Sequence, residues 1–156
     1  MSSNTETEKI IKEHRKWTLW IGRPRPMRLG NLVFTNRRLI FLHQIQSNPD
    51  VKDNIKKLAD APTEAVLNYA FSLNRSNFQI PLSAIGKVSI GTFNWTPFPH
   101  VCLSVIYFDG KRTAAKSASF QFIRPIKQTI LNPQLFVDIG WVQAINKAMK
   151  NADNIK

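Results

Sequence analysis

The strongest local constraint on this chain is a pair of strand-forming runs separated by only two residues. Arg28–Thr35 and Arg38–His43 are rich in β-branched, aromatic and leucine residues, and Asn36-Arg37 lies between them. Asn tolerates the left-handed backbone conformation that a two-residue hairpin demands. The spacing therefore predicts a tight β-hairpin.

Two further strand signals lie on either side of this hairpin. Lys16–Gly22 is aromatic and β-branched, and it stops at Gly22-Arg-Pro-Arg-Pro26, where two prolines cannot continue a hydrogen-bonded ladder. Phe78–Leu82 alternates in polarity, and Pro81 within it predicts a strand at the edge of a sheet. The first strand is thus expected to end in a stiff, basic loop.

The next segments complete the predicted sheet. Lys87–Phe93 has strand character, and Val101–Phe108 and Ala115–Ile123 flank a strong turn dipeptide at Asp109-Gly110. We expect the last two segments to pair as a second hairpin.

Helical periodicity occurs in two places. Within an insertion at residues 49–74, apolar residues recur three or four positions apart on both sides of Pro62, which predicts two short helices or one broken helix. Near the end of the chain, Asn132 and Pro133 predict a helix start, and one apolar stripe follows at Leu135, Ile139, Val142, Ile145 and Met149.

The order of elements predicts a mainly β fold: three strands, a helical insertion between strands 3 and 4, four more strands and a capping C-terminal helix. A seven-stranded antiparallel sandwich or open barrel fits this order. The residues expected to form most of the core are Leu32, Phe34, Leu39, Phe41, Ile80, Leu82, Val105, Phe120, Phe122, Leu135, Ile139 and Val142.

The length of 156 residues fits one domain, expected over residues 15–153, after a polar, flexible tail at residues 1–14. The single cysteine, Cys102, lies in an apolar run and favours a reducing compartment. The chain has no secretory-type N-terminus and no apolar stretch of membrane-spanning length. These features predict a cytoplasmic protein that can associate peripherally with a membrane.

The chemistry of catalysis is poorly represented. The three histidines, at positions 14, 43 and 100, are scattered, and neither a nucleophile motif nor a glycine-rich nucleotide loop occurs. One cysteine and three separated histidines do not provide paired metal-ligand spacing. The sequence therefore predicts no enzymatic activity, no metal and no cofactor.

The segment Gly30-Asn-Leu-Val-Phe-Thr-Asn-Arg-Arg-Leu-Ile-Phe41 resembles the signature of GRAM and bacterial PH-like domains, roughly Gly-x-Leu-x-x-Thr-Asn-x-Arg-Leu-Ile-Phe. Ile80–Ile85 and Val105–Lys111 resemble the family in order and spacing, so the resemblance spans residues 17–150. The insertion at residues 49–74 departs from the pattern. The resemblance implies a PH-like fold and a module that binds lipid or protein.

Charge is the best guide to a partner. The chain has 22 Lys and Arg against 10 Asp and Glu, a net charge of +12, which attracts nucleic acid, anionic lipid or acidic protein. Alternate connections of an up-and-down sheet leave from one end, so we expect the loops that carry Arg23, Arg25, Arg28, Lys111 and Arg112 to share a basic rim. Pro24 and Pro26, between Arg23 and Arg28, limit the freedom of the first loop and favour binding of anionic lipid headgroups, such as phosphoinositides.

Three alternatives remain open. Trp95 and Phe98, in an aromatic loop, could insert into a membrane interface or a partner groove, or could fold back over the sandwich. The insertion helices could dock a protein partner. Binding of nucleic acid by charge is the weaker alternative, because a row of aromatics along a basic sheet face is not visible.

Trp141 lies off the apolar stripe of the last helix. It therefore fits either a contact surface or a helix ridge packed on the sheet.

Overall fold

The structure, a computed structural model of the chain, describes residues 6–21, 28–43, 60–94, 99–108, 110, 115–123, 135–136 and 139–154. Its strands are β1 (Ile10–Ile21), β2 (Arg28–Thr35), β3 (Arg38–His43), β4 (Phe78–Pro81), β5 (Ile85–Asn94), β6 (Pro99–Tyr107), β7 (Lys116–Ile123) and β8 (Leu135–Phe136). The helical elements are α2 (Thr63–Ser72), the 3-10 turn η1 (Leu82–Ala84) and α3 (Ile139–Asn154).

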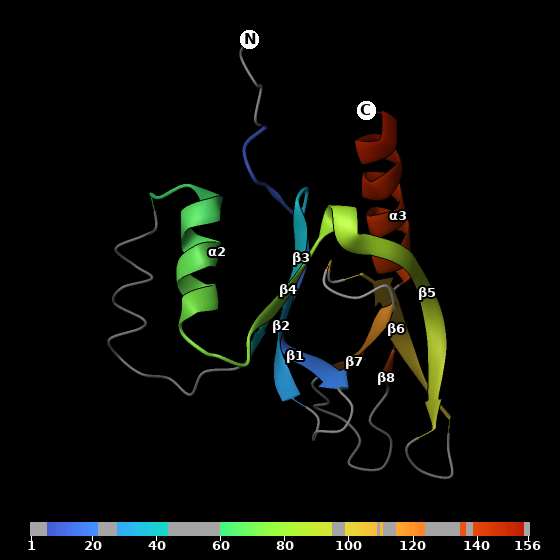
Figure 1. The fold of residues 1–156 in the computed structure, drawn as a ribbon. Coiled ribbons are helices and arrows are strands. Elements are labelled where there is room, and N and C mark those ends of the chain that lie inside the picture. The colour runs from blue at the N-terminus through green and yellow to red at the C-terminus, as the bar shows by residue number, and fades with distance from the viewer. Residues whose placement is uncertain are drawn as a thin grey trace.

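The strands form one continuous antiparallel sheet in the order β4-β3-β2-β1-β7-β6-β5, and β8 pairs with β7. The sheet curves so that α3 packs against β5, η1 and β1 (Figure 1). β4 lies at one edge of the order, as Pro81 predicts. The predicted fold class is confirmed: a mainly β architecture of seven antiparallel strands, to which the short β8 is added, with a C-terminal helix and a helical insertion between β3 and β4.

The first hairpin has the predicted boundaries, with Asn36 and Arg37 between β2 and β3. Gly30 lies opposite His43 on β3. A Cβ built on Gly30 would overlap the carbonyl oxygen of Leu42 and press on the Phe41 ring. The hairpin can therefore close only with glycine at this position.

The main core lies on the inner face of the sheet. All nine predicted core residues from Leu32 to Phe122 are buried, and Val142 packs partly buried against them. The side chains of Leu135 and Ile139 lie outside the described set. Rings of Trp20, Phe41, Phe78 and Phe120 contact one another at centroid distances of 4.5–6.2 Å. The alternation of apolar residues along the strands thus becomes one aromatic-rich core.

The insertion covers the opposite face of the first hairpin. Leu67 of α2 is buried against Val33 and Ile40, and Leu42 and Phe71 flank them. The second predicted helix is therefore confirmed as α2. The first, predicted at residues 51–59, lies outside the described residues.

Two predicted boundaries are wrong. β1 begins at Ile10 rather than near Lys16, so residues 6–14 do not form the predicted flexible tail: Ile10 pairs with Thr35 on β2, and Glu8 is buried. Helix α3 begins at Ile139 rather than at Pro133. Leu135, in β8, instead pairs with Ile123 at the end of β7. The pairing of β7 with β6 ends at Phe120, so the last residues of β7 can take β8 as a neighbour.

Candidate functional site

Most of the predicted site residues lie outside the described part of the chain. This applies to Arg23, Arg25, Lys111 and Arg112 of the basic rim and to Trp95 and Phe98 of the aromatic loop. Arg28 is the first residue of β2 and lies opposite Trp20, but its side chain is also outside the description. The contacts of these side chains remain predictions.

The strand registers show which residues lie at the end of the sheet where these loops begin. Trp20 lies opposite Arg28 on one neighbouring strand and Phe120 on the other. Gly30 lies opposite His43, near the end of β3. Neighbouring strands are antiparallel, so β1, β3 and β6 run in the same direction. The connections that follow them therefore leave from the same end of the strands.

The described scaffold carries little of the positive charge. Thirteen of the 22 Lys and Arg residues, but only four of the 10 Asp and Glu residues, have side chains outside the described set. Two scaffold arginines, Arg37 and Arg38, are moreover paired with carboxylates. The described side chains therefore carry a net charge of only +3, and the connecting segments carry the largest share of the surplus, +5.

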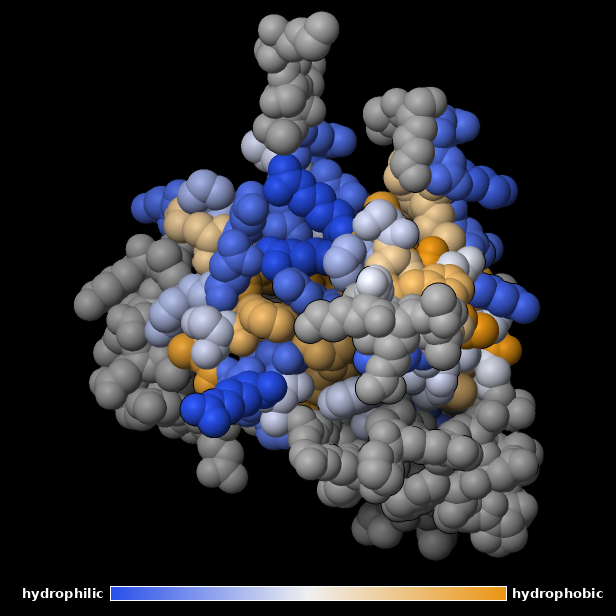
Figure 2. Space-filling view, viewed as in Figure 1, coloured by the Kyte–Doolittle hydropathy of each residue, from blue (hydrophilic) through white to orange (hydrophobic). Residues whose placement is uncertain are grey.

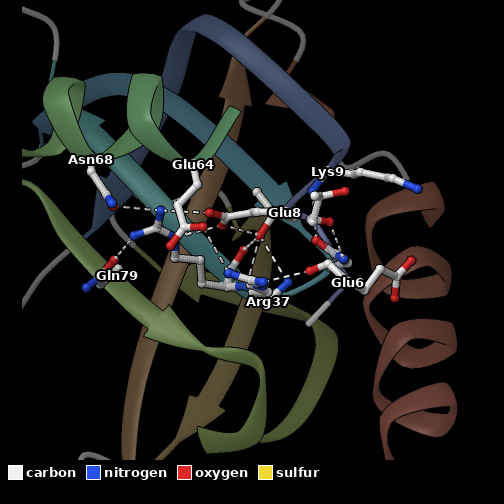
Figure 3. Close-up of polar contacts among 11 residues, drawn as sticks. Glu6, Glu8, Lys9, Arg37, Glu64, Asn68 and Gln79 are labelled. Atoms are coloured by element: carbon white, nitrogen blue, oxygen red, sulfur yellow. Dashed lines mark hydrogen bonds and ion pairs between the residues drawn. The ribbon is translucent and has the colours of Figure 1, made fainter. Parts of the chain in front are cut away.

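The largest polar constellation in the described residues lies at the opposite end, around the turn between β2 and β3 (Figure 3). Nε of Arg38 donates to Glu8 Oε1 at 2.8 Å, and its Nη2 donates to Glu8 Oε2 at 2.9 Å. The Thr35 hydroxyl donates to the same carboxylate at 2.8 Å. Only 1% of the Glu8 side chain is exposed. This bidentate pair ties the N-terminal segment to the hairpin.

The ionisation of Glu8 reflects these contacts. Burial by itself raises the pKa of the Glu8 carboxyl, but hydrogen bonds from Arg38 and Thr35 and the positive charges of Arg38 and Arg37 outweigh it. The net result is a pKa below the ordinary value. Glu8 is therefore ionised at neutral pH, and its contacts with Arg38 and Thr35 give it a structural role.

Helix α2 is joined to the same cluster. Arg38 also donates to Asn68 of α2 at 2.8 Å and to Gln79 of β4 at 2.7 Å. Arg37 donates to Glu64 of α2 at 3.1 Å and to the carbonyl oxygen of Glu6 at 2.6 Å. The two arginines thus connect the N-terminal segment, the hairpin, α2 and β4, and we call these contacts the arginine cluster.

Asn36 completes the attachment of the N-terminal segment. Its side-chain oxygen accepts a hydrogen bond from the Lys9 backbone N–H at 2.8 Å, and its amide nitrogen donates to the Thr7 carbonyl at 3.2 Å. Sequence reasoning assigned Asn36 to the turn and Arg38 to a strand, and it missed their second role. The signal available was the Thr-Asn-x-Arg spacing itself, which places three polar side chains at one turn.

A groove lies between the N-terminal segment and α3, with a volume of about 520 Å³. We call it the α3 groove. Glu6, Ile11 and Asn36 line one side, Leu82 contributes from η1, and Ala144, Lys147, Ala148, Asn151 and Ala152 line it from α3. A second hollow of about 330 Å³ shares Asn36, Leu82 and Ala152 with it. In Figure 2, hydrophilic residues gather below the N-terminus, and apolar and hydrophilic residues alternate over α3.

The described residues offer little for catalysis. They contain no group of three or more His, Cys, Asp or Glu side chains that could hold a metal ion. Burial raises the pKa of the Cys102 thiol against opposing hydrogen bonds from Ser119 and from the Gly91 backbone, so the thiolate is disfavoured. Within the described part, none of the helices combines the length and the apolar character needed to cross a bilayer.

Trp141 is buried, which decides between the two readings that its sequence position left open. It is 2% exposed and stacks on Phe122 at a centroid distance of 5.4 Å. The amino group of Lys12 lies 5.9 Å from its ring centroid. Trp141 therefore anchors α3 to the sheet and is not a contact surface.

Comparison with known proteins gives a likeness at the level of structure. No family model matches the chain, and no match is found among curated protein sequences. A solved structure described as the Vps36 N-terminal PH domain is similar, with a TM-score of 0.49 and 14% sequence identity over 94% of this chain and 83% of that chain. The identity is too low for residue roles or ligands to be carried from that domain to this chain.

Proposed function

We propose that the protein is a single, non-catalytic binding module that recognises anionic membrane headgroups through its basic connecting segments. The residues that carry the binding are Arg23, Arg25, Arg28, Lys111 and Arg112. The headgroup class is phosphoinositide-type, and the protein acts at a membrane surface without spanning it.

The observation that carries this proposal is the uneven distribution of charge. The described scaffold uses Arg37 and Arg38 in ion pairs, and the connecting segments carry the largest share of the net charge, with nine Lys and Arg residues against four Asp residues. The connections after β1, β3 and β6 leave from the same end of the strands. Cations grouped at one end produce a local field that attracts a polyanion, whereas evenly spread cations would only raise solubility.

The chemistry of the first loop favours phosphate. Guanidinium groups form paired hydrogen bonds with phosphate oxygens, and Pro24 and Pro26 restrict the backbone between Arg23, Arg25 and Arg28. Restricted arginines lose less conformational entropy on binding. Each cation near an anionic membrane contributes about 1 kcal/mol.

The experiment compares anionic and neutral vesicles. The Arg23→Glu/Arg25→Glu variant should lose most of its affinity for phosphatidylserine or phosphoinositide vesicles at physiological salt, with an unchanged thermal melt. A matched control is Lys9→Glu/Lys150→Glu, which changes the net charge equally at exposed scaffold positions near the opposite end of the sheet. The control should retain most of the vesicle affinity.

Either of two outcomes would reject the proposal outright. Wild-type protein could bind anionic vesicles no better than neutral ones, or both variants could lose affinity equally. A salt-sensitive mobility shift with RNA or DNA in the absence of vesicle binding would instead support nucleic acid. A protein partner retained by Arg23→Glu/Arg25→Glu and lost on substitution of Trp95 and Phe98 would support docking through the aromatic loop.

A further inference from the structure

We propose that the α3 groove is the surface through which two copies of this chain associate as a symmetric dimer. The groove combines a hollow and a projection on one patch. Ala144, Ala148 and Ala152 recur every four residues on α3 and form a row of small side chains. Ile11, on the facing side, is 46% exposed.

A two-fold interface joins a patch to itself, so the patch must be complementary to itself. Here Ile11 of one copy would enter the alanine-lined hollow of the other, and the reverse contact would form by symmetry. Alanine side chains leave space for the approach of another chain, and burial of the exposed Ile11 of each copy supplies the driving force. A groove that serves a different partner needs only the hollow, whereas the exposed Ile11 gives the same patch a projection, which favours a second copy.

The charges of the groove are also self-complementary. Glu6 and Lys147 line it from the N-terminal segment and from α3, and the Glu6 carboxylate points towards α3 (Figure 3). In a two-fold dimer Glu6 of each copy faces Lys147 of the other. Opposite charges that meet across an interface fix its register, whereas like charges would oppose it.

The net charge of +12 does not prevent this association. The charged residues that line the α3 groove and the adjacent hollow are Glu6, Lys147, Arg37 and Asp153, two of each sign. The excess cations belong mostly to other segments, and physiological salt screens charges beyond about 8 Å. Repulsion between copies is therefore weak at this patch, and dimerisation should strengthen as salt rises towards physiological values.

The test is the mass of the full chain by sedimentation velocity and light scattering over a wide range of concentrations. Wild-type protein should pass from monomer to dimer. Ile11→Asp should raise the dimer dissociation constant at least about tenfold, because a carboxylate would be buried at the centre of the interface. The matched control is Ile90→Asp, at a residue of β5 that is 44% exposed and does not line the groove, and it should leave the dimer intact. At low concentration, where the wild-type protein is monomeric, both variants should keep the wild-type melting temperature.

Charge exchange provides a second, independent readout. Glu6→Lys and Lys147→Glu should each weaken their own dimer, because like charges then face each other twice. An equimolar mixture should form a heterodimer, in which both contacts are again between opposite charges. Wild-type protein that stays monomeric at all concentrations, equal effects of Ile11→Asp and Ile90→Asp, or a mixture without heterodimer would overturn the proposal. The Arg23→Glu/Arg25→Glu variant should still dimerise. Failure of dimerisation would therefore leave the proposed lipid binding intact, and failure of lipid binding would leave dimerisation intact.

Discussion

The two faces of the hairpin formed by β2 and β3 are covered in different ways. The inner face buries Leu32, Phe34, Leu39 and Phe41 in the large core that α3 closes. The outer face buries two apolar side chains, Val33 and Ile40, under Leu67 of α2. Around this small apolar patch, the arginine cluster holds α2 and the N-terminal segment in place. The inner face thus depends on packing, and the outer face depends on a few apolar contacts and on ionised groups.

The largest effect is expected on the inner face. Phe122→Ala should lower the free energy of unfolding by about 3–5 kcal/mol, because it removes a fully buried ring and leaves a cavity. The ring stacks on Trp141 at 5.4 Å and meets the edge of His14 at 5.0 Å, so the loss should also loosen α3. Urea unfolding measures the change. A loss under about 1 kcal/mol would contradict the central place of Phe122 in the core.

The next effect separates ionised from apolar support. Glu8→Gln should cost about 3 kcal/mol at neutral pH, since it leaves the partly buried Arg38 without its charge partner. The folded-state pKa of Glu8 is lower than 4.5, so the carboxylate contributes its full stability above that pH and loses it as the pH falls through the lowered value. The difference between wild type and variant should therefore shrink on acidification.

The matched control is Glu64→Gln, which removes the Arg37 pair. The side chains of Arg37 and Glu64 are 37% and 52% exposed, and such a pair contributes about 0.5 kcal/mol or less. Equal losses of unfolding free energy for the two variants, or a loss for Glu8→Gln that does not change with pH, would show that the buried Glu8–Arg38 pair contributes no more than the exposed Arg37–Glu64 pair.

A smaller effect than that of Phe122→Ala or Glu8→Gln is expected from the apolar part of the outer face. Leu67→Ala should cost about 2 kcal/mol, near the lower end for a buried leucine, because its cluster is small and one side of the helix is exposed. Hydrogen exchange should accelerate in α2 while α3 remains protected. Equal acceleration in both helices would mean that the two faces unfold as one unit and would remove the distinction between them.

The same comparison explains which elements could be predicted from sequence. On the inner face every second residue is apolar and the turn at Asn36-Arg37 fixes the register, so the hairpin and its core residues follow from local pattern. Helix α2 also follows from its periodicity. Its position over Val33 and Ile40 does not, because periodicity identifies an apolar side and not the surface that it covers.

The wrong boundaries have the same origin. Ile10, Ile11 and their polar neighbours have no strong strand signal, and they join the sheet because Glu8 and Lys9 bind the hairpin turn 27–30 residues away. Leu135 has the spacing of a helical stripe but pairs with β7. In both cases contacts distant in sequence outweigh local preference.

The candidate sites divide similarly. The basic segments are visible in the sequence because charge and proline spacing are local properties, and their binding role remains a proposal. The α3 groove was not predicted at all, because its walls come from the N-terminal segment, η1 and α3. Only the folded chain places Glu6, Leu82 and Ala148 around one hollow.

The sequence by itself determined the order of strands and helices, the inner core from Leu32 to Phe122 and the excess of cations outside the scaffold, since alternation, turn residues and charge act over a few neighbouring positions. Tertiary structure decided the burial of Glu8 and Trp141, the true start of β1 and α3, and the existence of the α3 groove. These features depend on ion pairs, ring stacking and backbone pairing between segments far apart in the chain, whose free energy exists only once the sheet has closed.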